Sequence, residues 1–129
     1  MSTTAELARA YLAWINDRPS ERADVGRALL APDFVWTERP TRFGDRGRSG
    51  DANVLLQALA DADRMIEDER IVERTLFVSD QVAVMEVEWS GRLRRGGTVL
   101  RADGVMILET EDGRIRAARD YLCFDDPQG

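Results

Sequence analysis

The chain has 129 residues and a formal net charge of −6 at pH 7, and its eighteen basic residues are all arginine, since histidine and lysine are absent. This composition excludes imidazole catalysis, zinc sites built on histidine, Schiff bases on lysine and phosphate-binding Walker lysines. Proton transfer would have to use Asp, Glu, Tyr or the single Cys123.

The length and the even spread of apolar residues predict one domain over residues 1–129. The acidic balance argues against a nucleic-acid partner, and no apolar run approaches the ~20 residues of a membrane span. The N-terminal sequence lacks the pattern of a secretory signal, and one cysteine cannot form an internal disulfide, so we expect a cytoplasmic location. Without a histidine partner, Cys123 is expected to be a small buried hydrophobe and not a nucleophile.

The first part of the chain predicts two helices. Thr3 and Glu6 form a possible capping box before apolar residues at helical spacing over 5–15. After a breaker cluster, Ser20 can cap a second helix, which Pro32 is expected to end.

A short strand, a loop and a third helix follow. Residues 33–38 alternate, with Phe34, Trp36 and Glu38 on one face. Residues 39–50 are rich in Gly and Arg and have no period, which predicts a loop that could gate a cavity or attract an anionic group. Ser49 or Asp51 can cap the third helix.

The rest of the chain changes to a period of two. It predicts four strands, at 70–78, 82–93, 98–108 and 114–124, joined by short turns. Helices followed by antiparallel strands are typical of an α+β domain, because a parallel sheet would need helices between these strands.

Several phrases, taken in their order along the whole chain, resemble the nuclear transport factor 2-like superfamily, which includes ketosteroid isomerase, limonene epoxide hydrolase and SnoaL-like polyketide cyclases. The phrases are Tyr11 to Asn16, Ala28 to Trp36, Gly47 to Ala52, Asp112 to Ile115 and Arg119 to Tyr121. The resemblance implies a cone-shaped α+β barrel, with three N-terminal helices packed on a curved, mostly antiparallel sheet. It also implies a homodimer through the open face of the sheet.

Two carboxylates are the main catalytic candidates. Alternation places Asp120 with Ala118, Leu122 and Phe124, an apolar set suited to a pocket wall, and the phrase around Asp120 resembles the strand that carries a catalytic aspartate in the SnoaL-like cyclases and the epoxide hydrolase. Glu38 matches the general-base aspartate of ketosteroid isomerase by resemblance. The alternatives are structural: Asp120 as the partner of a nearby arginine, and Glu38 as an exposed side chain paired with Arg39 or Arg42.

Tyr11 and Asp103 match, by resemblance, the two hydrogen-bond donors of the ketosteroid isomerase oxyanion hole. Tyr11 could equally be an ordinary core aromatic. Alternation favours Leu100 and Ala102 as the apolar face of their strand and turns Asp103 to the opposite face, unless a bulge shifts the parity.

Another pair of carboxylates, Glu86 and Glu88, stands where the epoxide hydrolase has an Arg-x-Asp unit. The missing arginine argues against that reaction. Alternation favours an outer face for both glutamates, with Met85, Val87 and Trp89 inside.

Together these residues favour a cofactor-independent enzyme, with no metal, that uses pocket carboxylates on a hydrophobic small molecule. Isomerisation, polyketide cyclisation, dehydration and epoxide opening are the reaction types. The expected substrate-binding residues are Trp14, Trp36, Ala118, Leu122 and Phe124. The alternative is a non-catalytic domain of the same fold that binds a small ligand or dimerises.

Overall fold

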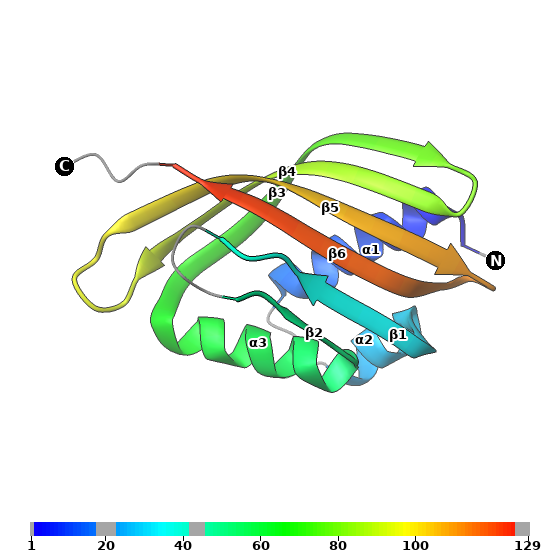
Figure 1. Ribbon diagram of the computed structural model, residues 1–129, viewed down its shortest axis with the longest axis horizontal. Coiled ribbons are helices and arrows are strands. Elements are labelled where there is room, and N and C mark those ends of the chain that lie inside the picture. The colour runs from blue at the N-terminus through cyan, green and yellow to red at the C-terminus, as the bar shows by residue number, and fades with distance from the viewer. Residues whose placement is uncertain (1, 18–22, 42–45, 126–129) are drawn as a thin grey trace.

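The computed structural model describes residues 2–17, 23–41 and 46–125 of this chain. Its helices are α1 (Thr4–Asn16), α2 (Ala23–Leu29) and α3 (Ala52–Met65). Its strands are β1 (Leu30–Glu38), β2 (Arg48–Gly50), β3 (Ile66–Ser79), β4 (Val82–Leu93), β5 (Val99–Glu111) and β6 (Arg114–Phe124). They form one mixed sheet in the order β2-β1-β6-β5-β4-β3, in which β1 and β6 are parallel and the other neighbours antiparallel (Figure 1). The protein is therefore an α+β domain, as the sequence predicted.

Helix α1 is fixed at both ends by polar side chains. The predicted capping box is present, because the Thr3 side chain accepts from the Glu6 backbone and the Glu6 side chain accepts from the Thr3 backbone. At the other end, the Asn16 amide donates to the carbonyl of Ile71 at 2.8 Å and accepts from its N–H at 2.9 Å. The helix is thus held against β3, with its apolar stripe facing the sheet.

Helix α2 packs closely on α1 through a glycine. A Cβ built on Gly26 would lie 1.9 Å from a ring carbon of Trp14, so no larger residue fits without movement. The predicted cap of this helix, Ser20, lies outside the described residues. The prediction that Pro32 ends α2 was wrong, because β1 already begins at Leu30 and includes the proline, where it meets no ladder partner.

The strand predictions were confirmed in position, and two features were missed. The loop 39–50 contains the short strand β2, whose residues pair with the end of β1. Strand β3 begins at Ile66, before the predicted start, because α3 passes directly into it. The sheet register shifts between Glu67 and Arg70, where Asp68 has a φ of 55°, and such a bulge breaks the alternation on which the prediction depended.

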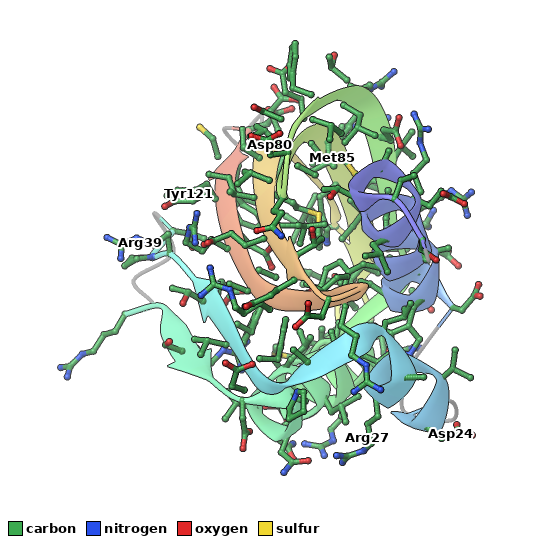
Figure 2. The ribbon with its side chains drawn as sticks, turned by 90° about the vertical axis from the view of Figure 1, so that its right-hand side faces the viewer. Asp24, Arg27, Arg39, Asp80, Met85 and Tyr121 are labelled. Atoms are coloured by element: carbon green, nitrogen blue, oxygen red, sulfur yellow. The ribbon has the colours of Figure 1, made fainter. Side chains whose placement is uncertain are left out.

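The sheet has an inner face, on which the helices pack, and an outer face (Figure 2). Met85, Val87 and Trp89 are buried on the inner side of β4, as predicted. Tyr121 is exposed and points outward on the side away from α1 (Figure 2). Cys123 is also exposed, which corrects the expectation that it is buried, because it shares the outer face with Tyr121.

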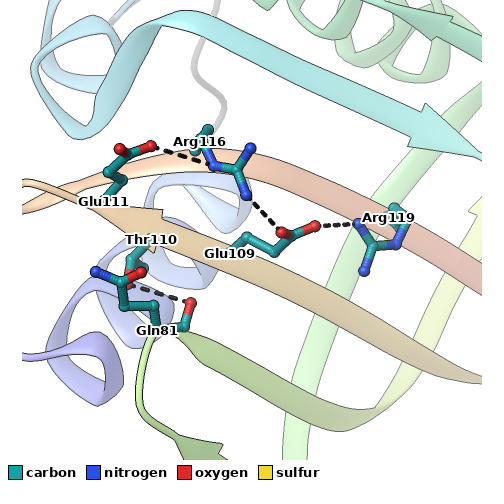
Figure 3. Close-up of polar contacts among 6 residues, drawn as sticks. All are labelled: Gln81, Glu109, Thr110, Glu111, Arg116 and Arg119. Carbon is teal, nitrogen blue, oxygen red and sulfur yellow. Dashed lines mark hydrogen bonds and ion pairs between the residues drawn. The ribbon is translucent and has the colours of Figure 1, made fainter.

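The outer face carries Asp103 and a network of ion pairs. Asp103 is exposed opposite Glu88, so no bulge shifts the parity of β5 at this point and Asp103 does not enter the interior. Glu109 binds Arg116 at 2.7 Å and Arg119 at 2.5 Å (Figure 3). The predicted outer location of Glu86 and Glu88 is confirmed, since Glu86 is exposed and Glu88 pairs with arginines on this face.

Candidate functional site

A pocket lies between α3 and the inner face of the sheet. Its inner part has a volume of about 100 Å³, and a wider outer part of about 420 Å³ shares several of its walls. The apolar lining of the inner part is Ile15, Trp36, Leu55, Ala58, Leu59, Ala62, Ile71, Val87, Trp89, Met106 and Leu122. Its charged lining is Glu38, Arg48, Glu69 and Asp120. An apolar cavity with a few convergent polar groups is the usual form of a small-molecule site.

Asp120 is the innermost carboxylate of this pocket. It lies on β6 between Glu38 of β1 and Met106 of β5, which are its register partners. Its Oδ2 accepts a hydrogen bond of 3.0 Å from Nε1 of Trp36, whereas its Oδ1 is buried and has no hydrogen-bond partner among the described residues. One carboxylate oxygen of Asp120 is therefore bound by Trp36, and the other is available to a ligand.

Burial, opposed by the Trp36 hydrogen bond and assisted by the charge of Glu38, raises the pKa of Asp120 to about 7. At neutral pH this carboxyl group thus populates both its protonated and ionised forms. A group with that property can either accept or donate a proton, which is the requirement for general acid–base catalysis.

Tyr11 is fully buried on α1, and its hydroxyl has no hydrogen-bond partner among the described residues. Burial, with the Asp120 carboxylate as a second cause, raises the Tyr11 pKa well above its usual value. The phenol is therefore a neutral hydrogen-bond donor at any physiological pH. Tyr11 and Asp120 carry the buried side-chain polar atoms that lack partners in the described part of the chain, and the charge of Asp120 contributes to the raised pKa of Tyr11. Tyr11 itself is not among the residues that line either part of the pocket.

Glu38 lines the pocket at the end of β1. Its Oε1 lies 3.6 Å from Nη2 of Arg48, its partner on β2, and Nη1 of Arg48 lies 3.7 Å from Oδ2 of Asp61 on α3. The sequence had proposed Arg39 or Arg42 as the structural partner of Glu38. Arg42 lies outside the described residues, and the ion pair seen here uses Arg48, which becomes a pocket residue because β2 pairs with β1.

Glu69 is a pocket carboxylate that the sequence did not reveal. Its Oε2 accepts a hydrogen bond of 2.7 Å from Nε1 of Trp89, and the Trp89 ring meets Phe124 edge to face at 5.3 Å. Glu69 lies within the bulged start of β3, outside the predicted strand, so its face could not be read from alternation. No local pattern in the sequence indicated that Glu69 faces the pocket.

The other predicted site residues divide into three groups. Leu122 lines both parts of the pocket and Phe124 lines the outer part. Ala118 is fully buried beside Trp36, and Trp14 is buried against α2; neither contributes to the pocket wall. The Trp14 ring packs against Gly26 of α2 instead. Asp103 is remote from the pocket, on the outer face of the sheet.

The described residues contain no group of three or more His, Cys, Asp or Glu side chains that could hold a metal ion. None of the helices in this described part of the chain has the length and hydropathy of a membrane span.

A sequence model of the SnoaL-like domain matches residues 8–118 of the chain. No curated protein sequence matches it.

Solved structures with the same fold are numerous, and three are typical. A protein with a ketosteroid isomerase-like fold from Catenulispora acidiphila, in complex with trimethylamine, has a TM-score of 0.75 and 19% identity, over 93% of this chain and 86% of that one. A SnoaL-like polyketide cyclase from Agrobacterium tumefaciens has a TM-score of 0.71 and 14% identity, over 98% and 94%. IdmH from Streptomyces antibioticus, described as a candidate polyketide cyclase, has a TM-score of 0.78 and 16% identity, over 94% and 92%. At these identities the likeness shows the fold alone.

Proposed function

Because this chain belongs to the SnoaL-like domain family, we propose that it is a cofactor-independent acid–base enzyme acting on a hydrophobic small molecule, with Asp120 as the group that moves the proton. The reaction is of the isomerase, polyketide cyclase, dehydratase or epoxide hydrolase type. The observation that carries the proposal is the environment of Asp120: a carboxyl group in an apolar pocket, with a pKa of about 7 and a buried Oδ1 that has no hydrogen-bond partner among the described residues.

In this proposal the pocket is the cone-shaped cavity that the resemblance implies. Oδ1 of Asp120 takes a proton from the substrate and returns it at another position, while Trp36 keeps Oδ2 and the carboxylate plane fixed. The Tyr11 hydroxyl donates a hydrogen bond to the substrate oxygen on which negative charge develops. Glu38 is the second acid or base, and Leu122 with Phe124 excludes water.

The experiment is a screen for proton transfer in D₂O without added metal or cofactor. A panel of cyclic enones, 1,3-diketones and epoxides is incubated with the protein, and deuterium incorporation or product formation is followed by NMR. We expect turnover of at least one class, reduced about 10²- to 10⁴-fold in Asp120→Asn, the usual range for loss of a general acid or base.

The matched control is Asp103→Asn, which makes the same chemical change on the exposed outer face of the sheet. It should keep the wild-type rate. Full turnover by Asp120→Asn, or an equal loss in Asp103→Asn, would contradict the assignment of the proton transfer to Asp120.

A second candidate function is supported by the small inner cavity and the ion pair at its mouth. A volume of about 100 Å³ admits only a small part of a ligand, and Glu38 is engaged by Arg48. Under this alternative the domain binds a hydrophobic ligand in the outer part without converting it. Saturable binding of a panel member by the wild-type protein, with no deuterium exchange at any pH from 5 to 9, would favour the binding domain.

We also propose a homodimer through the outer face of the sheet. The resemblance implies it, and large apolar side chains are exposed there, among them Val35, Val72, Phe77 and Tyr121. In light scattering, Phe77→Glu combined with Tyr121→Glu should convert a dimer to a monomer. A wild-type protein that is monomeric at micromolar concentration contradicts the proposal.

A further inference from the structure

We infer that Arg48 is a substrate-binding residue that selects molecules with a second, neutral oxygen acceptor, such as a ketone carbonyl, at the mouth of the pocket. This inference rests on the proposed function, because it assigns a further group of the substrate to the same site. It assigns a function to Arg48, a residue of the arginine-rich segment 39–50 that has no part in the proposed proton transfer.

The sheet register places Arg48 beside the proposed catalytic group. Glu38 pairs with Arg48 of β2 on one side and with Asp120 of β6 on the other, so the three residues form one row across neighbouring strands. Strands lie about 4.8 Å apart, which puts the Cα atoms of Arg48 and Asp120 about 10 Å from each other. All three line the pocket. A single small molecule can therefore reach Asp120 with one end and Arg48 with the other.

Two ion pairs with described residues orient the guanidinium of Arg48, and neither includes a hydrogen bond. Its nearest carboxylate oxygens, on Glu38 and Asp61, are 3.6 Å and 3.7 Å away, beyond hydrogen-bond length. The group lies 5.8 Å from the centre of the Trp36 ring, where a cation–π interaction adds to its orientation. Arg48 thus has an arranged charge and N–H groups that a ligand oxygen can occupy.

The charge of the pocket selects a neutral acceptor. Glu38, Glu69 and Asp120 line it as carboxyl groups, and Arg48 is the one cation among its described lining residues. A ligand carboxylate would gain from Arg48 but would be repelled by Glu38 and by the ionised form of Asp120. A ketone oxygen accepts a charge-assisted hydrogen bond from Arg48 without that repulsion. A cationic ligand would leave the Arg48 donors unused and would be repelled by them.

The two oxygens of the substrate then have separate partners. In the proposed function the oxygen next to the reacting carbon accepts a hydrogen bond from the Tyr11 hydroxyl, and the second oxygen lies at the mouth, with Arg48, which lines the outer part of the pocket. The narrow inner part accepts the reacting end, and the wider outer part accepts the apolar body.

The test compares binding of two neutral probes of the same shape, 2-acetylnaphthalene and 2-ethylnaphthalene, by NMR titration. We expect the wild-type protein to bind the ketone about tenfold more tightly, the gain of one charge-assisted hydrogen bond in a partly exposed site. Arg48→Met should remove this preference. Tyr11→Phe should keep it, because the bulky ring holds the carbonyl at the mouth.

The matched control is Arg64→Met. Arg64 binds the same carboxylate of Asp61, at 3.0 Å, but does not line the pocket, so this variant should keep the ketone preference. The fold of each variant is checked by thermal unfolding. 2-Naphthoate should bind less tightly than the ketone.

The outcomes separate this inference from the proposed function. A ketone preference that persists in Arg48→Met, that is lost in Tyr11→Phe instead, or that is absent from a wild-type protein binding both probes equally, overturns the role of Arg48 alone. Tighter binding of 2-naphthoate overturns the selection for a neutral acceptor. Failure of every probe to bind the wild-type protein removes the ligand pocket itself, and with it the proposed function.

Discussion

The indole Nε1 of Trp36 donates a 3.0 Å hydrogen bond to Oδ2 of Asp120, and this contact joins two neighbouring parallel strands on the inner face of the sheet. It stabilises the ionised carboxylate and so opposes the effect of burial on the Asp120 pKa. The tryptophan therefore adjusts the proton affinity of Asp120 as well as forming the wall of the pocket.

Trp36→Phe should raise the Asp120 pKa above about 7, because the ring remains while the hydrogen bond that lowers this pKa is lost. The measurement is a ¹³C NMR titration of the aspartate carboxyl groups. Trp89→Phe, which removes the hydrogen bond to Glu69, is the control and should leave the Asp120 titration in place. A lower or unchanged Asp120 pKa in Trp36→Phe would show that the indole does not stabilise the ionised form.

Asp120→Asn should change the pH dependence of stability. The folded-state pKa of Asp120 is raised, from an ordinary value of 3.8 to about 7, so the folded protein disfavours ionisation. The contribution of Asp120 to the free energy of unfolding of the wild-type protein is therefore fully present below pH 4 and is lost as the pH rises towards 7. The asparagine variant does not lose this contribution, because asparagine does not ionise. Its free energy of unfolding relative to wild type should therefore increase by about 2–3 kcal/mol between pH 5 and pH 8.

Urea unfolding of both proteins at the two pH values measures this difference, and the comparison cancels groups that titrate alike in both. Asp103→Asn should show no such trend, because Asp103 is exposed. A difference between Asp120→Asn and wild type that is constant with pH would mean that Asp120 ionises normally.

Tyr11→Phe should increase the stability of the protein and reduce its activity. The buried hydroxyl has no partner among the described residues, so its removal relieves an unsatisfied polar group, and the free energy of unfolding should rise by about 1 kcal/mol. Turnover of a substrate found in the proton-transfer screen should fall by about 10²-fold, because a donor to the developing oxyanion is lost. Tyr121→Phe, on the exposed outer face, should change neither quantity. A destabilised Tyr11→Phe variant would instead identify the hydroxyl as a structural group.

Gly26→Ala should destabilise the fold without reaching the pocket. Its Cβ would lie 1.9 Å from the Trp14 ring, and overpacking of this kind costs about 1–3 kcal/mol. In the Trp14→Leu background the same substitution should cost less, since the clash is removed. Additive effects in this double-mutant cycle, measured by chemical unfolding, would contradict direct packing of α2 on Trp14.

Alternation placed most of the functional residues correctly because regular strands keep a strict period of two. Asp120 and Leu122 face inward and Tyr121 outward, as predicted, since β6 is regular over this stretch. Asp103 was a candidate only by resemblance to the family. The alternation of its strand predicted the outer face instead, and this prediction was correct. The resemblance carries the fold and cannot assign each residue its role, because residues of different family members need not share a face.

The α+β class, the positions of the long strands and the restriction of proton transfer to carboxylates, phenol and thiol could all be predicted from the amino-acid sequence. These properties depend on composition and on patterns within single elements. Which side chains share the pocket depends on the packing of distant segments. Glu69 enters through a bulge, and Arg48 through a strand pairing between β1 and β2, neither of which leaves a local pattern. The available oxygen of Asp120 and its pKa of about 7 arise from burial by distant segments, so no single stretch of sequence contains them.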